Sequence, residues 1–439
     1  MIGNITISKV LKFTLPTITT TIIMMLYVTI DGIFVANVLG TNALAAVNLV
    51  FPLYGFAYGV GYMMGSGGIA ICATLLGRTE KAKARSLFST LIIATFIISL
   101  VLATLILSTT HLSFPFLGIT EETVAYASDY FFYMAIFVPT ISMQCVFYMA
   151  FIAAGRPRLC LVLTTCAGVT NVLLDYVFMV VMDMGIAGAG IATGFGTCVM
   201  VISGLIFFFR KTSGDLHFAR PVTDFKFLGK AMINGSSEML NITGRSVIIL
   251  LMNIAMLNLA GPDGVAAITA ILYTQSLLTS FFFGFSDGIA PVVSFNNGAK
   301  NACALRKLMR INLGTLAVLS IASFLVGFLF VNQISAIFGA NTHEVENLIV
   351  HGMHVFAFSF LFAGLNIFAS STFTAYSNGK ISALISFVKS YVFTIAALLI
   401  LPAMFGLDGV FVAVPIAEFL SAILAGTLLF RYRKKYMYA

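Results

Sequence analysis

The chain has 439 residues, of which 60% are hydrophobic and only 9% are charged, and its formal net charge is +8. A soluble globular protein carries about 25% charged residues, because water must solvate its surface. A mean hydropathy of +1.03 therefore excludes an ordinary soluble protein and predicts a chain that is solvated by lipid.

The apolar segments are long and continuous, as at 87–108 and 311–331. Runs of about 20 residues match transmembrane helices, whereas the strands of a membrane barrel alternate over about 10 residues. We therefore predict an all-α polytopic membrane protein with twelve transmembrane helices. In chain order the predicted spans are 10–36, 47–75, 87–108, 123–149, 158–182, 187–209, 227–258, 264–296, 308–331, 345–373, 380–404 and 409–431.

Lysine and arginine gather in alternate connections between these spans. The first set of connections, which includes both termini, holds Lys9, Lys12, Arg78, Lys81, Lys83, Arg85, Arg156, Arg158, Arg210, Lys211, Arg220, Lys226, Lys230, Lys300, Arg306, Lys307, Arg310, Lys380, Arg431, Arg433, Lys434 and Lys435. The opposite connections contain no Lys or Arg and hold Glu121, Glu122, Asp183, Asp263, Glu344 and Asp408. Because positively charged loops stay in the cytoplasm, both termini are predicted to be cytoplasmic. The basic charge thus indicates topology in a prokaryotic plasma (inner) membrane, and we expect no nucleic-acid partner.

The two halves of the chain resemble each other at an offset of about 221 residues. Gly67 matches Gly288, Gly77 matches Gly298, and the segment 39–47 matches 260–268. We predict two six-helix lobes, residues 1–209 and 227–439, joined by a cytoplasmic linker at 210–226. Since six is an even number, both lobes have the same orientation, and such a parallel repeat predicts a cavity at the lobe interface. This is the plan of a transporter.

Ionisable residues inside spans are costly and are candidates for function. They are Asp31 and Asp175 in the first half, and Glu238, Arg245, Asp287, Lys389 and Glu418 in the second. At 1.5 Å per residue, Asp31 lies about 30 Å from the cytoplasmic side and Asp175 about 25 Å, while Thr193 lies about 9 Å below the outer surface. Asn171 shares a helix face with Asp175, four residues away.

These four residues of the first half therefore fall at a similar depth in the outer half of the lobe. Their oxygens could bind a hard cation, or the two acids could carry a proton. The alternative is that Asn171, Asp175 and Thr193 only bond helices together.

In the second half, Lys389 and Glu418 lie at equal depth on adjacent spans, about 14 Å in. We expect them to form a structural ion pair, with Glu238 as a competing partner. Asp287 lies near the cytoplasmic end of its span, where solvation at the interface is an equal alternative to a functional role. Arg245 has no assigned role. Pro16 removes one hydrogen bond from the first span and is a candidate hinge.

Several segments, taken in this order, resemble the MATE (multidrug and toxic compound extrusion) family. They are Leu-Pro-Thr at 15–17, Asp-Gly-Ile-Phe-Val-Ala at 31–36, Asn171 to Asp175, Gly-Ala-Gly-Ile-Ala-Thr at 188–193, Asp-Gly-Ile-Ala-Pro at 287–291 and Ser-Phe-Asn-Asn-Gly-Ala at 294–299. The chain is most similar to the MepA/DinF-like branch of this family, within the MOP flippase superfamily.

The resemblance implies a V-shaped pair of lobes that export amphipathic, often cationic drugs by alternating access, in exchange for H⁺ or Na⁺. In that branch the coupling ion binds at positions that correspond here to Asp31, Asn171, Asp175 and Thr193. A neighbouring branch uses acids in the seventh and tenth spans. Here the tenth span, 345–373, has an acid only at its outer end, although Glu238 lies in the seventh.

Three alternatives remain open. A lipid-linked saccharide flippase of the same superfamily would need a cationic cavity, and only Arg245 and Lys389 are cations inside spans. An intramembrane enzyme is disfavoured, because no catalytic motif is present. The twelve-span repeat disfavours a receptor or channel. We expect a monomer that has no cofactor apart from the coupling ion and no metal site, since His343, His351 and His354 form no metal-binding pattern.

Overall fold

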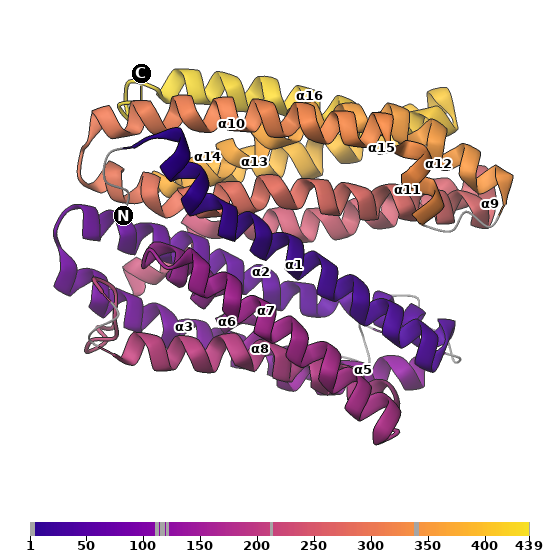
Figure 1. Ribbon diagram of the computed structural model, residues 1–439, viewed down its shortest axis with the longest axis horizontal. Helices are drawn as coiled ribbons and strands as arrows, with labels where there is room; N and C mark the ends of the chain where they lie inside the picture. The colour runs from indigo at the N-terminus through magenta and orange to yellow at the C-terminus, as the bar shows by residue number, and fades with distance from the viewer. Residues whose placement is uncertain are drawn as a thin grey trace.

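The computed structural model describes residues 5–109, 114, 119, 123–210, 214–337 and 342–438. Within these ranges the chain is helical and has no β-strand, as predicted. Figure 1 shows two helical lobes side by side, the first built from α1–α8 and the second from α9–α16. Glu121, Glu122 and Lys211, which entered the topology prediction, lie outside the described residues.

In the part of the first lobe that the structure describes there are eight helical segments. They are α1 (Ile7–Leu39), α2 (Thr41–Gly77), α3 (Lys81–Ser108), α5 (Val124–Ile136), α6 (Val138–Ala153), α7 (Pro157–Asp175), the π-helix η1 (Tyr176–Val181) and α8 (Gly185–Phe209). The second lobe contains α9 (Phe225–Gly298), α10 (Ala302–Leu329), α11 (Val331–Ile337), α12 (His343–Phe356), the 3₁₀-helix η3 (Ala357–Ser359), α13 (Phe360–Ala375), α14 (Gly379–Phe387), the π-helix η4 (Val388–Thr394), α15 (Ile395–Phe405) and α16 (Leu407–Tyr432).

The longest helix, α9, has 74 residues. At 1.5 Å per residue this is about 110 Å, far more than the hydrocarbon core of a bilayer, which is about 30 Å thick. Gly261 breaks the helical path with φ 63° and ψ −154°, and residues 225–260 and 262–298 correspond to two predicted spans. With α9 counted once, ten described helices are long and apolar enough to cross a membrane, or eleven if the bent pair α5–α6 is one span. The count of twelve stays a prediction.

Two features of the spans differ from simple straight helices. The predicted span 123–149 is bent by 53° between α5 and α6, next to Pro139 at the start of α6, which lacks a backbone N–H. In addition, π-helices follow α7 and α14, at corresponding places in the two lobes. The extra residue of a π-turn changes the direction of the following side chains, and such turns are frequent at functional sites.

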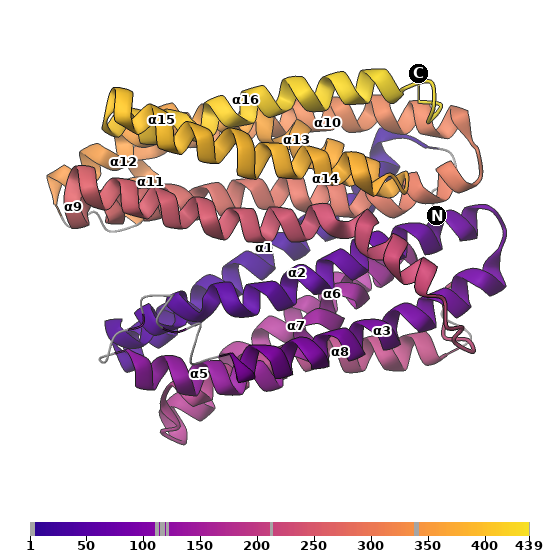
Figure 2. The ribbon, with the colours of Figure 1, turned by 180° about the vertical axis from the view of Figure 1, so that it is seen from behind.

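Both termini lie at the same end of the molecule, which we call the basic end because the Lys/Arg-rich connections lie there (Figures 1 and 2). The opposite end is called the acidic end. The linker packs against α3 at the basic end: Lys81 Nζ lies 2.7 Å from Asp215 Oδ1, and the Ser86 hydroxyl donates to the carbonyl of Arg220 at 2.6 Å. Phe218 stacks on Phe88 with ring centroids 5.3 Å apart. The described part of the linker is therefore bound to the first lobe.

The two lobes meet at the basic end through glycines of α2 and α9. A Cβ atom on Gly77 would collide with the carbonyl oxygen of Phe295, and one on Gly298 would collide with the carbonyl oxygen of Thr74. Both pairs are related by the repeat, since 298 − 77 = 221 and 295 − 74 = 221. The same backbone contact is thus made twice, which is what a parallel repeat produces about a pseudo-twofold axis.

Toward the acidic end the lobes diverge (Figures 1 and 2). Near the basic end, apolar clusters mix the lobes, as where Ile18 of α1 packs with Phe282 of α9. Nearer the acidic end the clusters are separate: one lies around Phe131 within the first lobe, and another around Phe411 within the second. The structure therefore has closed packing at the basic end and separated lobe cores at the acidic end.

The glycine contact predicts a difference between two Gly→Ala substitutions. Gly77→Ala should lower the free energy of unfolding by about 1–3 kcal/mol, because the added methyl group meets the backbone at Phe295 and the lobes must shift. Gly314→Ala in α10 is the control, since a Cβ there meets nothing within 4 Å. It should be neutral or stabilising through helix propensity. Unfolding of the purified variants in detergent measures both, and equal effects would contradict the interface.

Candidate functional site

The structure brings together two acids of the first lobe. Asp31 lies on α1 and Asp175 is the last residue of α7, and their carboxyl groups are close enough for their charges to repel each other. Asp175 is only 1% exposed. Asp31 is partly exposed. Two neighbouring carboxylates, one of them buried, are costly to charge together, which favours a bound cation or a shared proton.

The amide and hydroxyl of the predicted set complete this site. Asn171 donates a hydrogen bond from Nδ2 to the Thr193 hydroxyl on α8, at 3.3 Å. Within the described chain, no donor reaches Asp31 Oδ1, either carboxylate oxygen of Asp175, or Asn171 Oδ1. Buried oxygens without donors are unfavourable unless something else satisfies them. The site therefore has oxygens available for a small cation, or for protons on the carboxylates.

Glycines on the neighbouring helices make this close arrangement possible. Gly196 of α8 lies against Asn171, with 3.1 Å between the position of a Cβ and the Asn171 Cβ. Gly168 of α7 lies against Tyr27 of α1, at 3.3 Å by the same measure. The π-helix η1 begins directly after Asp175. Helix packing through small residues thus sets the distance between the three helices.

Tyrosines of α2 flank this site, and the sequence analysis missed them. Tyr54, Tyr58 and Tyr62 are four residues apart and share a helix face. Tyr54 and Tyr58 lie near Asp31 and Tyr27, and Tyr62 lies toward the second lobe. The spacing of four was visible in the sequence. It was not informative alone, because aromatic residues are common at core positions of spans.

The predicted pair in the second lobe is an ion pair in the structure. Lys389 Nζ on η4 lies 2.8 Å from Glu418 Oε1 on α16. Asn366 of α13 donates to Glu418 Oε2 at 2.6 Å and to its backbone carbonyl at 2.9 Å. Both carboxylate oxygens are thus engaged, and Glu238 is not the partner of Lys389. This arrangement favours a structural role.

Three other groups have local partners. Arg245 donates a hydrogen bond to the hydroxyl of Ser276, which joins the two halves of α9. His351 lies 2.6 Å from Asp408 at the acidic end, while His354 contacts the carbonyl of Val350. Within the described ranges, no three His, Cys, Asp or Glu residues are grouped to hold a metal ion.

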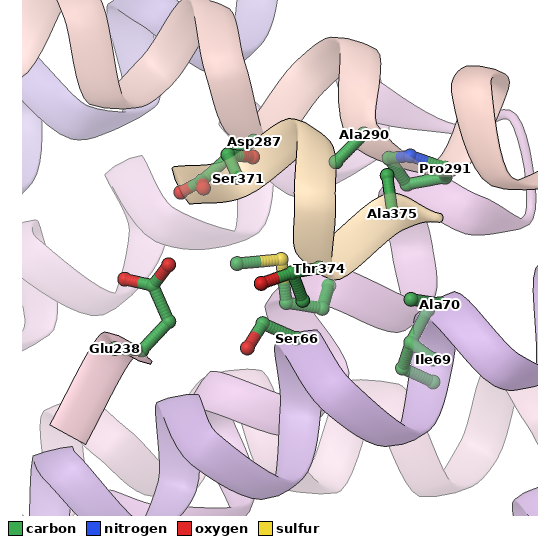
Figure 3. A pocket seen from close by; sticks show the side chains of 11 residues that line it. Ser66, Ile69, Ala70, Glu238, Asp287, Ala290, Pro291, Ser371, Thr374 and Ala375 are labelled. Atoms are coloured by element: carbon green, nitrogen blue, oxygen red, sulfur yellow. The ribbon is translucent and has the colours of Figure 1, made fainter. Parts of the chain in front are cut away.

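Glu238 and Asp287 line a small cavity between the lobes (Figure 3). Asp287 is buried, with 8% of its surface exposed, and its Oδ2 accepts a hydrogen bond from Tyr148 at 3.4 Å. Solvation at the membrane surface, one of the two interpretations left open, is therefore wrong for Asp287. The reason is that the first lobe covers the cytoplasmic part of its helix.

Pro16 lies within α1, which continues as one helix on both sides of it. Its carbonyl accepts a hydrogen bond from the Thr20 hydroxyl at 2.7 Å. The hinge stays a prediction.

Comparison with known proteins gives consistent results over nearly the whole chain. The MatE family model matches residues 16–177 and 231–400. The multidrug export protein MepA of Staphylococcus saprophyticus is 20% identical over 97% of this chain and 94% of that protein. Among solved structures, a variant of the Vibrio cholerae MATE transporter VcmN superposes with a TM-score of 0.91 at 18% identity, covering 99% of this chain and 98% of that one. An outward-facing MATE family transporter of the MOP superfamily gives 0.89 at 20% identity, covering 98% and 96%.

The ion pair of the second lobe predicts a non-additive mutant cycle. Glu418→Leu should destabilise the protein by up to about 3 kcal/mol, because Lys389, whose side chain is only 19% exposed, is left without its partner. The double variant Lys389→Met/Glu418→Leu should recover most of this loss, since neither charge remains. Thermal unfolding in detergent ranks the stabilities of the wild type, Glu418→Leu and the double variant. A double variant that is less stable than Glu418→Leu would contradict a purely structural pair.

Proposed function

This chain belongs to the MatE family, and we propose that it is a multidrug exporter of the plasma membrane that exchanges amphipathic, often cationic compounds for H⁺ or Na⁺. The named relatives that match over nearly the full chain are multidrug export proteins, which supports the substrate class. The ion and the transport cycle are inferred from the residues of the first lobe.

The observation that carries the proposal is the pair of Asp31, which is partly exposed, and Asp175, which is buried. Among the described residues no donor reaches Asp31 Oδ1 or either carboxylate oxygen of Asp175. Uptake of a proton or Na⁺ neutralises negative charge on the carboxylates, at a site where the burial of Asp175 limits solvation by water. Loss of the ion restores repulsion between the two carboxylates. The distance between α1 and α7 therefore depends on whether the ion is bound, and this dependence is the requirement for coupling.

Helix α1 can transmit this change because it touches both lobes. Beside the site, Tyr27 packs on Gly168 of α7. Nearer the basic end, the hydroxyl of Thr21 donates to the carbonyl of Ser280 on α9 at 2.8 Å. Pro16 lies further along α1 toward the basic end, where one backbone hydrogen bond is missing. A shift of α1 at the acids thus reaches the lobe interface.

In the proposed cycle, the lobes open alternately to the two sides of the membrane. The present arrangement, with packing at the basic end and diverging lobes at the acidic end, corresponds to the state open to the outside, if the basic end is cytoplasmic. The aromatic rings of Tyr54, Tyr58 and Tyr62 on α2 have electron-rich faces that attract organic cations. Ion binding in this state would favour release of the substrate, because the two ligands stabilise different states.

The alternative of a lipid-linked saccharide flippase has less support. Such a protein needs free cations for pyrophosphate, but Lys389 is paired with Glu418 and Arg245 is bonded to Ser276. Membership of a transporter family also argues against an intramembrane enzyme.

Dye efflux from energised cells tests this function. Asp175→Asn should reduce efflux at least tenfold, because the site can no longer alternate between charged and neutral forms. Asp408→Asn is the matched control, since Asp408 is exposed at the acidic end, away from the site. Cells that express this variant should show the same efflux as cells that express the wild type. Both variants must be present in the membrane at wild-type levels.

The same assay identifies the ion. Loss of efflux with a protonophore, whether or not Na⁺ is present, indicates H⁺. Dependence on external Na⁺ indicates Na⁺. Wild-type efflux by Asp175→Asn would overturn the assignment of the site.

A further inference from the structure

The cavity between the lobes has features of a second, separate ion site. It lies among α2, α6, α9 and α13, and its polar lining consists of Ser66 from the first lobe and Glu238, Asp287, Ser371 and Thr374 from the second. The space open to the centre of a water molecule is about 20 Å³, which holds about one water molecule. A drug cannot fit, but a dehydrated ion can.

The two acids of this cavity lack a cationic partner, although the hydroxyls of Ser371 and Thr374 are hydrogen-bonded within the second lobe. In the part of the chain that the structure describes, no Lys or Arg lies within ion-pair distance of Asp287 or Glu238, although the two acids are close enough to repel each other. The donor to Asp287 is Tyr148, at the long distance of 3.4 Å. The hydroxyl oxygen of Ser66 is buried and has no hydrogen-bond partner. Figure 3 shows Ser66, Glu238 and Asp287 around the cavity.

The internal repeat shows that the acids are specific to the second lobe. At the offset of 221 residues, Asp287 corresponds to Ser66 and Glu238 corresponds to Thr17 (287 − 66 = 238 − 17 = 221). Ser66 and Asp287 therefore occupy equivalent positions on α2 and α9, and both line the same cavity near the pseudo-twofold axis. Helix packing alone is achieved with hydroxyls in the first half, so it does not require the two carboxylates in the second.

We propose that this cavity binds one small monovalent cation, such as Na⁺, with oxygen ligands from both lobes, and so holds the basic ends of the lobes together. Carboxylate and hydroxyl oxygens suit a hard cation. Mg²⁺ is disfavoured, because it keeps several water molecules and the cavity has room for about one. Because Ser66 belongs to the first lobe, the complete site exists only while the basic ends are closed.

This site is independent of Asp31 and Asp175, so it can be tested where the first-lobe pair has been removed. The measurement is equilibrium binding of ²²Na⁺ to the purified full chain in detergent, in the background Asp31→Asn/Asp175→Asn. About one Na⁺ should remain bound per protein. Adding Asp287→Asn should weaken binding at least tenfold, whereas adding Asp408→Asn should leave it unchanged.

Asp287→Asn could weaken binding by disturbing the fold, so a smaller substitution in the first lobe serves as a second test. Ser66→Ala should weaken Na⁺ binding several-fold, and Ser66→Thr, which keeps the hydroxyl, should retain it. Each variant should elute from gel filtration as the parent does. Absence of Na⁺ binding in the double-Asn background, or binding that Asp287→Asn and Ser66→Ala do not change, would overturn the proposal. Either result would leave the efflux prediction for Asp175 standing, since that assay uses an intact cavity.

The effect on the lobes is measured separately by the distance between spin labels at Lys83→Cys on α3 and Lys307→Cys on α10. Both lysines are exposed near the basic end, and the accessible native cysteines would be replaced by serine. Na⁺ should increase the population with the shorter distance, and Asp287→Asn should abolish this response. A distance distribution that Na⁺ does not alter would contradict the link between the lobes.

Discussion

The backbone contact between α2 and α9 at the basic end is the constraint on which the rest of this structure depends. Lipid gives apolar helices no hydrophobic reason to associate, so close packing of small residues must hold the lobes together. Gly77 and Gly298 provide it twice, against Phe295 and Thr74. With the lobes fixed there, their angle determines the separation of their cores at the acidic end and encloses Asp287 at the interface.

Helix α1 joins this interface to the acids of the first lobe. Its basic half packs on the second lobe through Thr21 and Ser280, and its acidic half packs on α7 through Tyr27 and Gly168. A helix attached to both lobes cannot change its contact with Asp175 without a change in its contact with α9, unless it bends. Pro16 lies in the half that contacts the second lobe, and its missing hydrogen bond lowers the cost of bending there.

Much of the fold and of the first-lobe site could be predicted, because both follow from regular geometry along one helix. The rise per residue is fixed, so it placed Asp31, Asp175 and Thr193 at a similar depth, and the structure brings the two acids close enough for their charges to repel each other. What depends on other helices could not be predicted. The depth of Asp287 along its own span indicated the membrane surface, but the first lobe covers this residue. The bend at α5–α6 likewise depends on packing around Pro139 and not on hydropathy.

The repeat gives two lobes of the same design, and their differences lie in their buried charges. In the first lobe, no Lys or Arg of the described residues pairs with Asp31 or Asp175, so their charge changes when an ion binds or leaves. In the second, Glu418 is neutralised permanently by Lys389 and fixed by Asn366. The Lys389–Glu418 pair therefore keeps its charges compensated at all times, whereas Asp31 and Asp175 depend on a bound ion. Because of this asymmetry, ion binding at the first-lobe acids changes one side of the structure, while the part of the second lobe around Glu418 keeps its shape.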